Sequence, residues 1–198
     1  MTVVFAVPFG DGAELAMLEP WHAEQFLATL DRSREHLYAT APAARSIFTI
    51  DDARRYLRSW ADAHAGDTRH LFGIWLDGTL VGCCQLLQFD ARAGTCELGA
   101  WIAPDVEGRG LVTRACRQVI DWAILVRGVS RVQWMNDPGN ERSRRVALRL
   151  GMTREGLLRG VGVLNSPAMD FVDASARWDG EIWSVLASEW PTGLVTYG

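Results

Sequence analysis

The most constraining feature of the sequence is a strand that leads through a glycine-containing loop into an amphipathic helix. The strand is predicted over residues 96–103, and the loop holds Gly108 and Gly110 with one residue between them. After the loop, apolar side chains recur at helical spacing and share one face, while Arg114, Arg117 and Asp121 lie elsewhere. The apolar positions are Val112, Ala115, Cys116, Val119, Ile120, Ala123 and Ile124. This block requires a fold in which a helix packs on a sheet directly after a glycine turn.

The loop Gly108-Arg109-Gly110 has the chemistry of an anion site. Glycines let the backbone approach a ligand closely, because no Cβ atom obstructs it. The first N–H groups of the following helix have no partner within the helix, and the helix dipole favours an anion there. A phosphate or pyrophosphate is therefore the expected ligand. The alternative is a structural turn, because the loop matches neither a P-loop nor a full dinucleotide fingerprint.

Strand and helix patterns alternate along the rest of the chain. The predicted strands are residues 14–18, a hairpin over 70–87 that turns at Asp77-Gly78, and residues 129–135, 152–164 and 168–178. The predicted helices are residues 21–30, 51–64 after a cap at Thr49 or Asp51, 112–124, 141–150 after a cap at Asn140, and 181–190. Residues 32–46 are expected to form a loop with a short helix. The pattern predicts a mixed α/β fold in one domain, residues 1–198.

Composition excludes several classes of protein. Of the 198 residues, 48% are apolar and 22% charged, which is typical of a globular chain that folds without a metal or disulfide. The net charge of −4 lacks the basic footprint of a nucleic-acid-binding protein. No apolar run reaches the ~18 residues of a membrane span. The apolar first ten residues are not preceded by a basic flank, so we do not expect a cleaved signal peptide. We therefore expect a cytoplasmic protein with no membrane or nucleic-acid partner.

Cysteine and histidine positions give no sign of a metal site. The four cysteines, Cys83, Cys84, Cys96 and Cys116, have no zinc-type spacing and are predicted to be buried thiols. The four histidines, His22, His36, His64 and His70, have no ligand spacing, and surface or supporting roles are expected for them. All twenty basic residues are arginines. GC-rich coding explains this bias, and the alternative is that an enzyme which acylates amines avoids modifying itself.

Two blocks, in order, resemble the GNAT superfamily of N-acetyltransferases, and within it the branch typified by RimJ and RimL. The first block comprises Glu97-Leu-Gly-Ala-Trp-Ile102, Glu107-Gly-Arg-Gly-Leu-Val-Thr113 and Ala115-Cys-Arg117. The second runs from Asn140-Glu-Arg-Ser143 to Gly151-Met152 and is followed by Glu155-Gly156 and Arg159, with Asn165 and Asp170 resembling a late hairpin. The resemblance covers roughly residues 49–190. It implies the GNAT fold, a mixed and mostly antiparallel sheet of six to seven strands flanked by helices.

The resemblance also implies acetyl-CoA as the acyl donor and assigns residues to it. Backbone amides from Gly108 to Val112 would hold the pyrophosphate, and the strand end at 101–103 would pair with the pantetheine arm. The residues implied to bind the cofactor are Trp101, Ile102, Ala103, Gly108, Arg109, Gly110, Leu111, Val112, Thr113 and Asn140. For Asn140 the alternative is a plain helix cap. No metal is implied.

Ser143 and Glu97 are the implied catalytic residues. Acyl transfer from a thioester to an amine needs a proton for the departing thiolate and a neutral nucleophile. Ser143 would donate that proton or orient a water, unless it is a solvent-facing helix serine. The RimL-like base position falls on Gly162, so Glu97, on the same strand face as Gly99 and Trp101, is the alternative base. Glu97 as an ordinary solvated carboxylate remains open.

The sequence-based hypothesis is an acetyl-CoA-dependent N-acetyltransferase that acts on a primary amine, the N-terminal α-amine of a ribosomal or other protein. Trp21 and Trp101 are expected near the acceptor. One alternative is an acetyltransferase for a small amine such as a polyamine, an amino acid or an antibiotic. Another is a non-catalytic acyl-CoA-binding protein, which the absent base at Gly162 favours. The family resemblance also implies a homodimer. The sequence also departs from the GNAT pattern at Asp105, three residues before the first glycine of the loop, where the wider family often has Gln or Arg.

Overall fold

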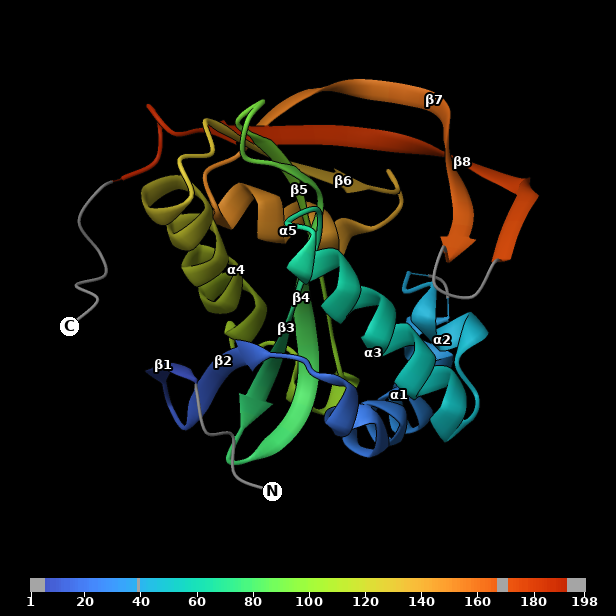
Figure 1. Cartoon of the computed structure of the whole chain (residues 1–198). Coiled ribbons are helices and arrows are strands. Elements are labelled where there is room, and N and C mark those ends of the chain that lie inside the picture. The colour runs from blue at the N-terminus through green and yellow to red at the C-terminus, as the bar shows by residue number, and fades with distance from the viewer. Residues whose placement is uncertain (1–5, 39, 167–170, 192–198) are drawn as a thin grey trace.

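The computed structural model describes residues 6–38, 40–166 and 171–191, in which one mixed sheet separates two groups of helices (Figure 1). The strands are β1 Val7–Gly10, β2 Ala13–Met17, β3 His70–Leu76, β4 Thr79–Asp90, β5 Thr95–Ile102, β6 Arg131–Asn136, β7 Thr153–Ser166 and β8 Phe171–Leu186. The helices are α1 Ala23–Leu37, α2 Ala43–Ser46, α3 Ile50–Ala65, α4 Leu111–Asp121 and α5 Glu141–Arg149. Short 3-10 turns at Pro20–His22 and Pro104–Val106 precede α1 and the glycine loop, and a π turn at Trp122–Val126 extends α4.

Each sheet face carries its own apolar core. On one face, side chains of α1 and α3, such as Phe26 and Leu57, pack against Trp75 and Trp101. On the other face, α4 and α5 pack against the opposite side of the same strands (Figure 1). Alternation along β5 explains the division, because Leu98 belongs to the second core and Trp101 to the first. The sheet therefore brings residues from both helical layers to neighbouring positions.

The pairing of β5 with β6 is parallel and stops early. The strand order is β1-β2-β3-β4-β5-β6-β8-β7, and the other neighbouring strands pair antiparallel. The β5–β6 register runs from Thr95 opposite Arg131 to Glu97 opposite Gln133 and ends there. Beyond that point β5 stays paired with β4, and β6 stays paired with β8. The two strands separate toward their carboxyl ends and leave an opening in the sheet.

The expected α/β fold is confirmed, with eight strands in place of six or seven. Strand β1 lies in the apolar first ten residues and was not predicted. Helix α1 continues to Leu37, seven residues past its predicted end. The continuation escaped prediction because polar residues, Thr29 and Ser33, occupy its buried face. Thr29 satisfies its hydroxyl by donating to Leu80 O at 2.8 Å.

The predicted helix over residues 181–190 is wrong. These residues continue β8 as far as Leu186, and a turn follows. Strand β8 lies between β6 and β7 and pairs with both. Trp183 and Val185 pack in one core, and Ser184 is buried where its hydroxyl donates to Glu155, so the two-residue alternation of buried and exposed positions is lost. The apolar residues of this segment therefore recur at a spacing typical of a helix, which explains the wrong prediction.

The four cysteines are buried and unpaired, as predicted. Of the four histidines, His22 and His70 are buried. His70 contacts His64 through their Nδ1 atoms at 2.7 Å, and burial lowers the pKa of His70 to about 4. Over the described ranges, no group of three or more metal-ligating side chains occurs. The described helices also include none that is long and apolar enough to cross a membrane.

Gly82 on β4 sets the position of the carboxyl end of β5. A Cβ atom at Gly82 would lie 2.4 Å from Trp101 O and 2.9 Å from Ile102 Cα, both backbone atoms. We predict that Gly82→Ala destabilises the protein by about 1–3 kcal/mol, because the strand must shift to relieve the overlap. Gly156→Ala is the matched control, since nothing lies within 4 Å of its added Cβ. Denaturant unfolding measures both, and equal stabilities would contradict this account of the strand contact.

Candidate functional site

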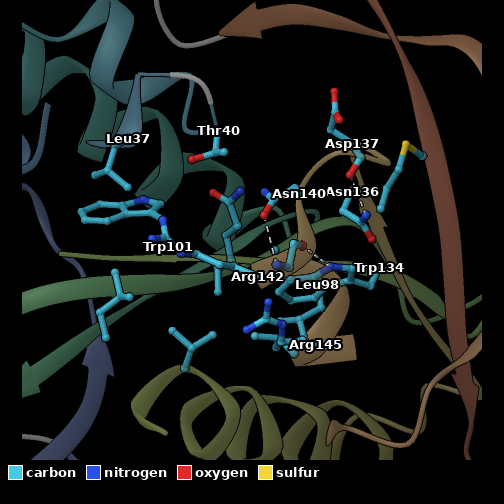
Figure 2. Close-up of a pocket in the computed structure, with 18 of the residues that line it drawn as sticks. Leu37, Thr40, Leu98, Trp101, Trp134, Asn136, Asp137, Asn140, Arg142 and Arg145 are labelled. Carbon is cyan, nitrogen blue, oxygen red and sulfur yellow. Dashed lines mark hydrogen bonds between the residues drawn. The ribbon is translucent and has the colours of Figure 1, made fainter. Parts of the chain in front are cut away.

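A pocket of about 820 Å³ occupies the opening between β5 and β6. It is lined by both helical layers, since Leu37 and Trp101 come from one face of the sheet and Leu111 and Val146 from the other. Figure 2 shows Leu37, Thr40 and Trp101 on one side of the pocket and Trp134 on the other. The pocket is thus a passage through the sheet, in which two ligands can meet from opposite faces.

The glycine loop forms one end of the passage. Gly108 and Gly110 have φ values of 77° and 73°, a conformation that favours glycine, and added Cβ atoms there would meet no atom within 4 Å. Gly110 is the N-cap of α4, and its carbonyl accepts the first helical bond, from Arg114 N at 3.1 Å. The N–H groups of Leu111 to Thr113 precede that bond, so they have no helical partner and line the pocket.

Helix α5 adds positive charge to this end of the passage. Arg142, Arg145 and Arg149 line the pocket, and their spacing places them on one helical face. All three are exposed. Free amides at a helix start together with three arginines fit a ligand that carries several phosphate charges, such as coenzyme A.

The edge of β5 supplies backbone groups to the opening. Ala103 N donates to Val81 O at 2.7 Å, and the antiparallel ladder alternates, so Trp101 and Ala103 direct their backbone groups to β4. Leu98, Ala100 and Ile102 therefore direct theirs toward β6, and beyond Leu98 no strand pairs with them. Of the predicted arm-binding residues, Ile102 has its backbone at the opening and Trp101 contributes its side chain, whereas Ala103 is buried outside the pocket.

The start of α5 positions Ser143 through two hydrogen bonds (Figure 2). Asn140 Oδ1 accepts from Ser143 N at 3.1 Å and so caps the helix, which leaves the Asn140 amide group available as a donor. Trp134 Nε1 donates to Ser143 Oγ at 2.8 Å. Because an indole N–H can only donate, Ser143 accepts from Trp134 and keeps its own O–H for another partner. No sequence pattern predicted the role of Trp134, since its contact with Ser143 depends on how α5 packs against β6.

Glu97 lies on the other side of the passage, where β5 and β6 begin to separate. Gln133 Nε2 donates to Glu97 Oε2 at 3.4 Å, and burial raises the pKa of Glu97. The other pocket carboxylates are already engaged. Glu107 lies 2.8 Å from His36 Nε2 and 3.6 Å from Arg142 Nη2, and Asp137 accepts from Gly139 N at 2.7 Å. Among the described residues, no arginine or histidine lies within 4.0 Å of Glu97, so its charge is not offset by an ion pair there.

The remaining predicted residues separate into two groups. The larger group lines the pocket and comprises Gly108, Gly110, Leu111, Val112, Thr113, Asn140, Ser143, Glu97 and Trp101. Arg109 is exposed beside it, and Trp21 is 61% exposed outside it. Gly162 is paired with Trp178, a pocket residue, so the RimL-like base position is beside the passage but has no side chain. Asn165 and Asp170 lie outside the residues whose side chains are described. The contact between His36 and Glu107, which joins α1 to the glycine loop, was not predicted.

Comparison with known proteins decides the family. The model of the acetyltransferase (GNAT) domain matches residues 15–153, well over half of the chain. The chain belongs to the GNAT family of acetyltransferases. GNAT enzymes transfer an acetyl group from acetyl-CoA to an amine, and the resemblance inferred from the sequence is thereby confirmed. The opening between β5 and β6 and the glycine loop are then the parts of the GNAT fold that form the passage.

Two GNAT relatives and one solved structure illustrate the similarity. YdaF of Bacillus subtilis, named as a ribosomal N-acetyltransferase, is 28% identical over 186 residues, which is 90% of this chain and 100% of its own length. A spermidine N(1)-acetyltransferase of Escherichia coli is 28% identical over 98 residues, 49% of this chain and 53% of its own. RimL, a ribosomal L7/L12 α-N-protein acetyltransferase solved with coenzyme A, superposes with a TM-score of 0.81. RimL is 13% identical in sequence, and the superposition covers 92% of this chain and 98% of the RimL chain.

We predict that Gly110→Glu abolishes coenzyme A binding and leaves the fold intact. The added carboxylate would enter the pocket beside the helix amides and repel the phosphates. Charge-assisted hydrogen bonds are worth ~1.5–3 kcal/mol each, so losing two weakens the affinity about a hundredfold or more. Calorimetric titration with coenzyme A measures the loss.

Gly151→Glu is the matched control for this substitution. Gly151 also has a positive φ, 75°, and open space around its Cβ position, but it follows α5 and does not line the pocket. It carries the same charge change and the same backbone strain, and its coenzyme A affinity should remain near that of the unmodified protein. Equal affinities in all three proteins would remove the loop from the binding site.

Proposed function

We propose that the protein transfers an acetyl group from acetyl-CoA to the α-amine at the N-terminus of a protein. The observation that carries this proposal is the passage through the sheet, with the glycine loop and free helix amides at one end and the partly buried Glu97 on the opposite face. Such a passage keeps the acyl donor and the amine on separate approaches until they meet. YdaF matches over nearly the whole chain and is named a ribosomal N-acetyltransferase, and a second relative is named a ribosomal-protein-serine acetyltransferase, which supports a protein acceptor.

Acetyl-CoA would be held by residues of α4, α5 and β5. The amides of Leu111 to Thr113 and the α5 arginines face the phosphates, and the edge of β5 pairs with the pantetheine arm. The thioester supplies the acetyl group and the thiolate leaving group. Because the β5 edge and the helix amides are fixed by secondary structure, they require little reorganisation when the ligand binds.

Ser143 provides the proton for the leaving thiolate in this proposal. Its oxygen accepts from Trp134, so the hydroxyl hydrogen is the one that faces a further partner. Its backbone N–H is held by the Asn140 cap, which fixes the helix start. Trp134 is thus a positioning residue that acts through Ser143.

Glu97 accepts the proton from the acceptor amine, directly or through a water. Its pKa is raised by burial, which brings a carboxylate closer to the range in which it works as a base near neutral pH. Gln133 opposes that shift by donating to the ionised form. The proton donor Ser143 and the proton acceptor Glu97 therefore lie on opposite sides of the opening.

We predict that Ser143→Ala lowers kcat by roughly ten- to a thousandfold with little change in the acetyl-CoA KM, as expected when a proton donor is lost. Trp134→Phe keeps the ring but removes the N–H, and it should lower kcat to a smaller extent. In the Ser143→Ala background, Trp134→Phe should have no further effect on kcat, because its target is gone. Steady-state kinetics of the four proteins tests the pair. Normal turnover of Ser143→Ala would reduce Ser143 to a surface residue.

We also predict that an α-amine is acetylated at least a hundredfold faster than a lysine side chain. The unperturbed pKa is ~7.7–8.0 for an α-amine and ~10.4 for lysine, so near pH 7.4 about a fifth to a third of the α-amine is neutral against about a thousandth of the lysine. A site with one weak base favours the amine that is already deprotonated. The kcat/KM of a peptide and of its α-blocked, lysine-containing counterpart measures this, and equal values would contradict the proposal.

A further inference from the structure

Two arginines from distant parts of the chain line the acceptor side of the passage. Arg45 belongs to α2, which is in the same helical layer as α1 and α3, and Arg177 is next to Trp178 on β8. Figure 1 shows the bent end of the β7–β8 hairpin reaching toward α2. Both residues thus line one pocket from different elements, and Figure 1 shows α2 and the hairpin end on the side of the molecule away from α4.

Neither arginine is neutralised by the described part of the chain. Arg45 donates its Nε to Tyr38 O and lies 5.0 Å from the centroid of the Tyr38 ring. Arg177 donates Nη1 to Gly160 O at 2.8 Å. These partners are carbonyl oxygens and an aromatic face, and no described carboxylate lies within 4.0 Å of either guanidinium. Both side chains retain their charge and have further N–H donors to offer.

Among the described residues, the carboxylates that line the pocket are Glu97, Glu107 and Asp137. Glu97 lies deep in the passage, whereas Glu107 is held by His36 and Arg142. An acceptor that enters here would meet Arg45 and Arg177 first and Glu97 within the passage. A polyamine carries a second ammonium group that would then lie among arginines, where like charges repel. A peptide with an ammonium group at its end and carboxylates behind it has the complementary order of charges.

We propose that the acceptor is a protein N-terminus with acidic side chains in the residues that directly follow the amine. Arg45 and Arg177 would bind those carboxylates while the amine reaches Glu97. The inference rests on the proposed α-amine acetyltransferase activity and specifies its substrate class. The pair acts on acceptor recognition and does not touch the acetyl-CoA end of the passage.

The test compares three peptides that share an N-terminal serine and differ in the next two residues, which are acidic, neutral amide-bearing or basic. We expect kcat/KM to fall in that order, by about tenfold from acidic to neutral, the equivalent of ~1.4 kcal/mol. The difference should shrink at high ionic strength, because the attraction is between partly exposed charges. In the double variant Arg45→Glu with Arg177→Glu, the order should reverse, and spermidine should become a better acceptor than it is for the unmodified protein.

Arg58→Glu is the matched control, since Arg58 is exposed on α3 and does not line the pocket. Calorimetric affinity for coenzyme A shows whether each variant is folded with its cofactor site intact. If the charge reversal unfolds the chain, the double variant Arg45→Gln with Arg177→Gln replaces it in the same comparison. Equal rates for the three peptides would overturn this inference and leave the α-amine activity standing. An unchanged preference in a folded double variant would overturn the assignment to Arg45 and Arg177. Acetylation of spermidine in place of all three peptides would overturn the proposed function as well.

Discussion

The separation of β5 and β6 is the constraint on which the rest of the site depends. After Glu97 and Gln133 the two strands pair with different neighbours, β4 on one side and β8 on the other. An unpaired strand edge inside a protein must be satisfied by water or by a ligand. The same separation brings residues of both sheet faces to one pocket, so donor and acceptor can meet without sharing an entrance.

Within the passage, chemistry is divided between the two faces. On one side, the indole of Trp134 donates to Ser143 Oγ, so the Ser143 hydroxyl keeps its own proton for donation. On the other side, burial raises the pKa of Glu97, beside which the described part of the chain places no cation. Charge is divided in the same way, because the α5 arginines accompany the glycine loop while Arg45 and Arg177 lie on the acceptor side. A donor rich in phosphate and an amine acceptor thus meet different electrostatic surroundings.

Local patterns predicted what is locally determined. The glycine loop before α4 and the Asn140 cap of α5 depend on a few adjacent residues, and both occur where they were expected. Features that depend on distant partners were missed or misassigned. Residues 181–186 have helical spacing but form a strand because β6 and β7 cover both edges of β8. Two further features depend on the tertiary arrangement and on no short motif. One is the hydrogen bond from Trp134 to Ser143, and the other is that Arg45 and Arg177 line the same pocket.

The most direct test of this account is a crystal structure of the protein with coenzyme A and an N-terminal peptide bound together. The account predicts that the pantetheine arm lies along the β5 edge from Leu98 to Ile102, with its sulfur within hydrogen-bond distance of Ser143 Oγ. The peptide amine should approach from the opposite face, on the side of Glu97. A structure in which both ligands enter from one face, or in which the arm lies away from the opening between β5 and β6, would contradict it.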